Sequence, residues 1–464
     1  MFLNFFEIIG IISSIMLLLF IIIISFCLIK TIAFKNKGIR ILQRDDVPKE
    51  VQEELGKKLL DYIKIRTKTF SNEENYHIFR EKLKVDYPLI HQNFNKERID
   101  GNVIFTYNKH IDNAPNILYA THVDSIEEYQ EPCLTKKHLY GNETFDAKAL
   151  FFVVFEAVEK ILREDHELKN NLTLVITIDD EGKKTGEDKI INKFLKEGKF
   201  FHLIIEEGSG IMDPISSGLR SHHAFIGTGV TGEAVFRFKT SKSGRGESRL
   251  QAFTTEVRNT NLFKTYIDNE TRKTITSIAK DMTFSNRLIY GNPLIFKPII
   301  RQLIDNDQIE ISKMLKTQII YGVSDESDDY CYIDLTFELS YHDTIPDIVC
   351  ALEKIMQKNS IEYELISSTE GTKITSTNSY GYKIVSKVIE ETFDSVYISP
   401  YIISSIAENR EYDKVSDNVI RFSPLYYSHN AKINKENNNE YVSLNSLGKG
   451  VEFFDRLTRE CIKR

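Results

Sequence analysis

The pattern of apolar and polar positions begins with one long apolar segment. Residues 8–29, IIGIISSIMLLLFIIIISFCLI, are 22 residues without a charge, which is long enough to cross a bilayer. A cleaved signal peptide has a shorter apolar stretch and a small-residue cleavage site, and neither is evident. The sequence therefore predicts a transmembrane anchor over residues 1–34 and a basic tether over residues 35–48.

After the tether, apolar residues recur alternately at helical spacing and in short runs bounded by turn residues. Strands that alternate with helices are typical of a mainly parallel sheet covered by helices on both faces. We predict an α/β domain of this class, with its first part over residues 49–229 and its second part over residues 369–464. The helices and strands expected in the first part are 51–65, 103–107, 116–120, 149–164, 172–178 and 201–205.

The pattern changes near residue 230. Residues 232–241 and 330–341 alternate apolar and polar positions, as half-buried antiparallel strands do. Residues 343–357 have helical spacing, and residues 361–366 follow as a further strand. The sequence therefore predicts a smaller α+β domain of ferredoxin-like type, inserted over residues 230–368.

Charge and cysteine content exclude several classes of protein. The net charge is −7, and no cluster of Lys and Arg would neutralise phosphates, so we expect no nucleic-acid partner. The five cysteines are scattered without a CxxC pair, which excludes a thiolate zinc module and a disulfide-dense scaffold.

Two signals on membrane orientation disagree. Lys and Arg residues follow the apolar segment while Glu7 precedes it, so the positive-inside rule favours a cytosolic body. Asn142, Asn171 and Asn269 lie in N-x-Thr sequons, which matter only in a secretory lumen. The side of the membrane stays open.

Three expected strands are each followed by acidic residues or a histidine. These are His122-Val123-Asp124, Asp179-Asp180-Glu181 and Glu206-Glu207. The carboxyl ends of parallel strands share one sheet edge, where ligands bind. Carboxylates brought together there repel one another unless a cation neutralises them, and oxygen with imidazole ligands suits zinc, manganese or cobalt. Each group alone is more often a structural feature or a solvated turn, and it is the coincidence of three such strand ends that favours a metal site.

At these residues the chain resembles zinc metallopeptidase family 20, which includes carboxypeptidase S, aminoacylases and succinyl-diaminopimelate desuccinylase. The resemblance runs from about residue 49 to the C-terminus. It is greatest to the branch of membrane-anchored carboxypeptidase S and N-acyl-amino-acid amidohydrolases. It implies a lumenal or vacuolar body, two divalent metal ions, with zinc favoured, and pairing of two copies through the inserted lid/dimerisation domain.

The resemblance also implies a role for individual residues. Its H-x-D motif makes His122 a metal ligand and Asp124 the partner that orients it, while Asp180 becomes the general base. Arg410 corresponds to the arginine that holds the substrate carboxylate. The remaining implied metal ligands are Asp146 in YGNETFDAKA, Glu181 beside the base, Glu206 in EEGSG and His429 in RFSPLYYSHN.

Three positions depart from the family pattern. The base is Asp180 rather than Glu, Glu247 stands where the lid domain carries a histidine, and Glu338 lies near an expected arginine. An anion facing a developing oxyanion has the wrong sign to stabilise it. Two functions therefore remain. One is a membrane-anchored metallo-amidohydrolase or carboxypeptidase acting on peptides or N-acyl amino acids with a free carboxylate. The other is a catalytically impaired relative that keeps the metal site and serves as a ligand-binding or interaction protein.

Overall fold

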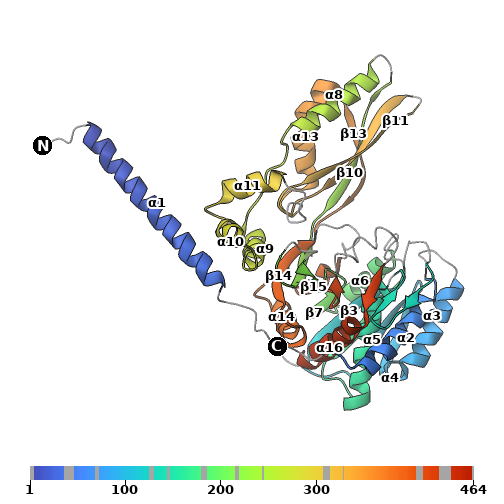
Figure 1. Ribbon diagram of the computed structural model, residues 1–464. Helices are drawn as coiled ribbons and strands as arrows, with labels where there is room; N and C mark the ends of the chain where they lie inside the picture. The colour runs from blue at the N-terminus through green and yellow to red at the C-terminus, as the bar shows by residue number, and fades with distance from the viewer. Residues whose placement is uncertain are drawn as a thin grey trace.

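The fold is that of a computed structural model. It describes residues 5–35, 46–67, 73–124, 130–142, 144, 147–178, 185–214, 219–242, 245–306, 314–327, 329–403, 411–427 and 440–461. Figure 1 shows a long N-terminal helix, a large α/β body and a smaller sheet-and-helix unit at the far end.

The N-terminal helix α1 (Phe5–Lys35) contains the apolar segment. Its stretch Ile9–Phe34 is long and apolar enough to cross a membrane, by length and composition, and nearly all of it is exposed. The helix leads away from the body, and its C-terminal part lies beside α10 (Phe284–Tyr290) (Figure 1).

The body is built on a ten-stranded mixed sheet in the order β1-β2-β6-β3-β7-β15-β9-β8-β16, with β14 also pairing β9. At its centre β6, β3, β7 and β15 are parallel, whereas β1 and β2 add an antiparallel edge. The strands are β1 (Phe94–Ile99), β2 (Asn102–Tyr107), β3 (Asn116–His122), β6 (Asn171–Thr177), β7 (Leu203–Glu206), β8 (Ile211–Met212), β9 (His223–Val230), β14 (Tyr397–Ile403), β15 (Val419–Arg421) and β16 (Tyr426–Tyr427).

Helices cover this sheet, and a small sheet of β4 (Cys133–Leu134), β5 (His138–Tyr140) and β17 (Tyr441–Ser443) flanks it. The helices of the body are α2 (Lys49–Ile63), α3 (Glu73–Asp86), α4 (Pro88–Asn93), α5 (Ala147–Asp165), α6 (Thr185–Lys196), α14 (Tyr380–Thr392), α16 (Leu444–Glu460) and the 3-10 helix η1 (Glu411–Lys414).

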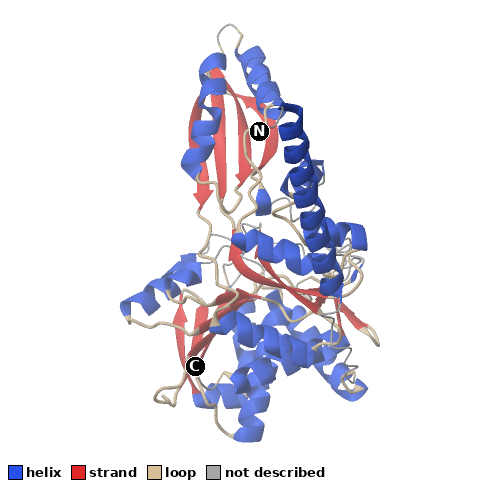
Figure 2. Cartoon of the chain, turned by 90° about the vertical axis from the view of Figure 1, so that its left-hand side faces the viewer, coloured by secondary structure: helices blue, strands red, loops and turns tan. Residues whose placement is uncertain are grey.

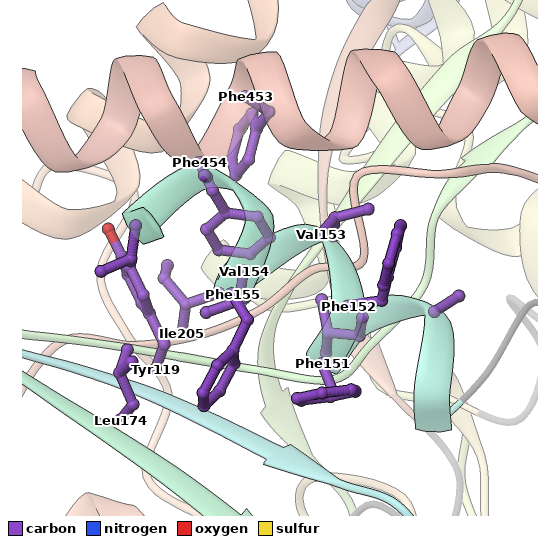
Figure 3. Packing of buried hydrophobic residues seen from close by; sticks show 14 of the residues in the cluster. Tyr119, Phe151, Phe152, Val153, Val154, Phe155, Leu174, Ile205, Phe453 and Phe454 are labelled. Atoms are coloured by element: carbon purple, nitrogen blue, oxygen red, sulfur yellow. The ribbon is translucent and has the colours of Figure 1, made fainter. Parts of the chain in front are cut away.

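Helix α5 forms the centre of the main core. It carries the apolar run Leu150–Phe155, which is fully or almost fully buried. Figure 3 shows Phe155 lying toward Tyr119 and Leu174 of the sheet, while Phe453 and Phe454 of α16 cover the helix from the other side. A helix that is apolar nearly all round must be covered on several faces, and the sheet, α2 and α16 provide that cover.

The smaller unit is a four-stranded antiparallel sheet in the order β11-β12-β10-β13. Helices α8 (Gly246–Asn259) and α13 (Ile345–Asn359) pack on one face of it (Figure 2). Its strands are β10 (Glu233–Ser241), β11 (Gln318–Glu326), β12 (Tyr330–Glu338) and β13 (Glu362–Thr369). Buried and partly exposed positions alternate along β10 and β12, which confirms the antiparallel strands expected from the sequence.

A helical insert, residues 260–317, connects α8 to β11. It contains α9 (Asn269–Ala279), α10 and α11 (Lys297–Asn306), and α9 packs against β14 of the body. Asp281, just after α9, accepts hydrogen bonds from the backbone N–H groups of Arg220 and Ser221. These contacts attach the insert to the body, and Phe263 at the other end of the insert packs against Phe337 of β12 in the four-stranded sheet.

The expected helices and strands of the first part are confirmed, with boundaries shifted by one or two residues. The strand expected over residues 201–205 is β7, which begins at Leu203 and ends at Glu206. Phe201 makes only an isolated bridge to Ser416. The shift places Glu206 within the strand, where its side-chain direction is fixed by the pleat.

Candidate metal centre

His122 is the last residue of β3, and its ring is almost fully buried at the carboxyl edge of the central sheet. Its Nδ1 lies 3.3 Å from Oδ1 of the buried Asp124, and its Nε2 lies 2.5 Å from Oε2 of Glu207. A carboxylate at one ring nitrogen orients the imidazole and leaves the other nitrogen for a metal. The roles predicted for His122 as a metal ligand and Asp124 as its orienting partner stay predictions.

Glu206 is the last residue of β7, and Glu207 follows beyond the end of the strand. Glu206 is paired in register with Arg421 of β15. Its Oε1 lies 2.7 Å from Nη2 of Arg421, and both side chains are fully buried. The structure thus brings Glu207, rather than Glu206, to the imidazole of His122.

The close approach of β15 explains the glycine after the two acids. A Cβ placed on Gly208 would lie 2.4 Å from the carbonyl carbon of Arg421. Such a contact is far inside van der Waals distance, so only glycine fits between Glu207 and the backbone of β15.

The other site residues predicted from the sequence lie outside the described residues. These are Asp146, Asp180, Glu181, Arg410 and His429. The elements next to them are described. Thr177, the last residue of β6, pairs with His122, and Asp180 follows three residues later. Their roles stay predictions.

Lys148 comes from the first turn of α5, two residues after Asp146. The side chain is almost fully buried, and its ammonium donates a hydrogen bond to the carbonyl oxygen of Ile65 at 2.7 Å. This bond holds the start of α5 against the segment after α2, which fixes where the chain leaves the loop that contains Asp146.

The donors present suit a divalent cation of intermediate softness. Imidazole and carboxylate are ordinary zinc ligands, and Asp124 supplies the hydrogen-bonding partner that such a histidine usually has. Within the described part of the chain, no group of three or more His, Cys, Asp or Glu side chains is arranged to hold a metal ion. His122 and Glu207 would therefore be two of the ligands.

Three other histidines of the described residues, His222, His223 and His342, make contacts of their own. His223 is buried beside Asp281, and burial lowers the pKa of its imidazole to about 4. His342 pairs with Asp268 in the helical insert. His222 packs edge-on against the ring of Tyr426, and burial lowers the pKa of His222.

Glu247 lies in the first turn of α8, at the outer end of the four-stranded sheet (Figure 1). Strand β10, which begins just after β9 of the body, carries the chain outward over nine residues, a distance of roughly 30 Å. Within one chain, Glu247 is therefore remote from His122, and its charge does not act on the candidate centre.

Sequence reasoning missed Glu207 and Arg421. The local signal for Glu207 was its place next to Glu206, but the register of β7 with β3 ends before Glu207 and does not indicate which acid contacts His122. Arg421 belongs to the RFSP stretch that was read only as a marker for His429. A charged residue between apolar strand residues would have indicated a buried ion pair.

Comparisons with known proteins place this chain and its fold in a family. The model of peptidase family M20/M25/M40 matches residues 118–460. A Danio rerio protein, N-fatty-acyl-amino acid synthase/hydrolase PM20D1.1, is 20% identical over 337 residues, which cover 69% of this chain and 65% of its own length. A Dictyostelium discoideum protein, "Probable carboxypeptidase S-like 2", is 21% identical over 420 residues, covering 83% of this chain and 79% of its own.

Solved structures share the fold at low sequence identity. The M20 family metallo-carboxypeptidase Sso-CP2 from Sulfolobus solfataricus superposes with a TM-score of 0.62 at 14% identity, covering 88% of this chain and 99% of its own. Human carnosine dipeptidase 1 gives a TM-score of 0.60 at 11% identity, covering 89% of this chain and 97% of its own. The family model spans most of the sequence, so the resemblance is confirmed: the chain belongs to peptidase family M20/M25/M40, a family of hydrolases.

Proposed function

We propose that the chain is a membrane-anchored, metal-dependent amidohydrolase or carboxypeptidase that cleaves peptides or N-acyl amino acids with a free carboxylate. The observation that carries the proposal is the His122 imidazole, held by Asp124 on one side and faced by Glu207 on the other. The printed names of the relatives, a fatty-acyl-amino acid synthase/hydrolase and a carboxypeptidase S-like protein, indicate the substrate class.

His122 and Glu207 would hold the metal, together with the predicted ligands Asp146, Glu181 and His429. When bound, a divalent ion of this kind lowers the pKa of a water molecule and polarises the amide carbonyl. Asp124 would keep the imidazole in the tautomer that presents Nε2.

The proton transfer and the binding of the substrate carboxylate are assigned to residues named by the family resemblance. Asp180 would take a proton from the attacking water and pass it to the leaving amine. Arg410 would bind the substrate carboxylate through two parallel hydrogen bonds, which explains why substrates should carry a free carboxylate.

Membrane anchoring by α1 is part of the proposal, and two of the three sequons provide little support for a lumenal body, while Asn269 is exposed. The side-chain oxygen of Asn142 accepts a hydrogen bond from the backbone N–H of Gln130. The Asn171 amide bonds the backbone of Ile111 as both donor and acceptor. Both asparagines are thus used inside the fold.

The test is hydrolysis of N-acyl amino acids and dipeptides by the full-length chain in detergent with added zinc, using Glu206→Gln and Glu207→Gln as a matched pair. We expect Glu207→Gln to lower kcat/KM by about a hundredfold, as loss of a ligand or positioning contact does, with the circular dichroism spectrum unchanged. Glu206→Gln should instead lower stability through its effect on Arg421.

The result also separates the two candidate ligands and the two functions. If Glu206→Gln abolishes activity in a folded protein while Glu207→Gln does not, Glu206 is the ligand. If the wild-type chain binds zinc but gives no turnover above that of Asp180→Ala, the catalytically impaired relative is the correct function. The substitution of Asp180 for the usual Glu favours this second candidate.

A further inference from the structure

The helical insert is fixed against the last turns of α1. The ammonium of Lys30 donates a hydrogen bond to the carbonyl oxygen of Gly291 at 2.7 Å. The amide of Asn292 lies 3.4 Å from the hydroxyl of Thr31, and Thr31 and Cys27 are fully buried in this contact, although most of α1 is exposed. The insert therefore sits where the apolar helix reaches its first charged residue.

A cleft of about 420 Å³ between α1 and the insert shows the level at which they meet. It is lined by Phe26 and Lys30 of α1 and by Leu294 and Ile295 of the insert. Phe26 precedes Lys30 by four residues, roughly 6 Å along the helix axis. Leu294 and Ile295 thus lie at the boundary between the charge-free span and its basic end.

Apolar side chains of the insert are left exposed at this boundary. Leu294 is 63% exposed and Ile295 is 43% exposed, and Phe284 and Ile299 are also exposed. Exposed apolar residues that gather on one surface indicate a binding surface. The covering surface here is a bilayer, because α1, which lines the same cleft, is the candidate membrane span.

The charge of the insert also fits a lipid surface. Residues 260–317 contain nine Lys and Arg and six Asp and Glu, a net charge of +3, whereas the whole chain has a net charge of −7. Arg272 lines the cleft beside Leu294. Cations close to a bilayer are attracted to anionic head groups.

We propose that the helical insert is a second membrane contact, in which Leu294 and Ile295 enter the head-group region and Arg272 binds anionic phospholipid head groups. The inference rests on the proposed span by α1. Helix α9 of the insert packs on β14 of the body. The membrane contact of the insert would therefore hold the large sheet at a fixed height and tilt above the bilayer. Helix α1 would then not be the only element that positions the body.

The test measures membrane depth at single labelled cysteines in the full-length chain, reconstituted in phosphatidylserine-containing vesicles. The exposed Cys133 and Cys350 are first replaced by Ser. A polarity-sensitive dye is then placed at Leu294→Cys and its quenching by nitroxides attached near the lipid head group is recorded. The matched control is Val323→Cys on β11, an apolar residue that is 89% exposed but distant from α1 (Figure 1).

We expect strong quenching and a blue-shifted emission at position 294, and neither at position 323. Leu18→Cys, in the middle of α1, reports on the span itself through nitroxides deep in the bilayer. Quenching at 18 but not at 294 overturns the inference and leaves the anchor intact. The absence of quenching at both position 18 and position 294 overturns both the membrane contact of the insert and the membrane span by α1. Equal quenching at 294 in phosphatidylserine and in pure phosphatidylcholine vesicles overturns the role of Arg272.

Discussion

His223 is a histidine that the fold keeps neutral. It is the first residue of β9, its ring stacks on Phe225 and Tyr397, and its Nε2 lies 3.3 Å from Asp281. Burial, the largest effect, lowers its pKa to about 4, with His222 acting in the same direction and Asp281 in the opposite one. Protonation of this imidazole is thus linked to unfolding.

The sign of the effect follows from the two pKa values. In the unfolded chain the imidazole has its ordinary pKa of about 6.5, so between pH 6.5 and 4 the unfolded state binds more protons. The contribution of His223 to the free energy of unfolding is therefore fully present above pH 6.5 and is lost as the pH falls towards 4. We expect His223 to account for about 2 kcal/mol of the free energy of unfolding lost between pH 7 and pH 5.

This prediction is checked by urea unfolding of the detergent-solubilised chain, followed by circular dichroism at both pH values. His223→Phe keeps a stacked ring and removes the titration. The variant should lose less stability than the wild type over that interval. Parallel pH profiles for the two proteins would rule out His223 as the responsible group.

The two adjacent glutamates show how far residue-level reasoning from the sequence extends. The EEG stretch after a buried apolar run predicted acids at the carboxyl edge of the sheet, and both Glu206 and Glu207 are there. Which acid faces His122 depends on the boundary of β7 and on its register with β15. Those are long-range properties that a local pattern does not contain. The buried ion pair of Glu206 with Arg421 joins residues 215 positions apart.

Among the elements, the meeting of β7 and β15 is the contact most sensitive to side-chain size. A Cβ on Gly208 would meet the backbone of Arg421, and backbone atoms cannot move aside as a flexible side chain can. Gly208→Ala should therefore push the two strands apart. We expect a loss of about 1–3 kcal/mol in the free energy of unfolding, the usual range for overpacking.

The same substitution should displace Glu207, the preceding residue, from His122 and lower hydrolytic activity as well. Gly10→Ala in α1 is the matched control, because an added Cβ there meets nothing within 4 Å. Thermal unfolding and kcat/KM are measured for both variants. A Gly208→Ala protein with wild-type stability would show that β15 can yield at this point.

The local sequence pattern predicted the helices and strands well. It predicted the order and direction of the strands in the sheet less completely. The runs of apolar and β-branched residues in β2, β3 and β6 are buried on both faces, which is why they could be recognised without a partner strand. The mixed order of the sheet could not be read in this way. The antiparallel pairing of β2 with β6, for example, joins strands more than 60 residues apart.

At the scale of the whole molecule, the body, the four-stranded sheet and α1 are arranged so that the candidate centre and the insert belong to one unit. The insert is attached to the body by Asp281 and by α9 on β14. The four-stranded sheet continues from β9 through the short link to β10, and Phe263 of the insert packs against its strand β12. A ligand that stabilises the centre should therefore stabilise the body as a whole.

Metal binding provides the test of that coupling. A ligand that binds only the native state raises its stability by RT ln(1 + [L]/Kd), about 2.7 kcal/mol at a concentration one hundred times Kd. We expect the melting temperature of the detergent-solubilised chain to fall by about 5 °C when zinc is removed by a chelator, and to return when zinc is restored. His122→Ala should melt at the same temperature with and without zinc, because the imidazole that Asp124 orients is gone. His110→Ala removes a largely exposed imidazole and should keep the full zinc-dependent shift in melting temperature. Loss of the shift in both variants would mean that the metal binds elsewhere.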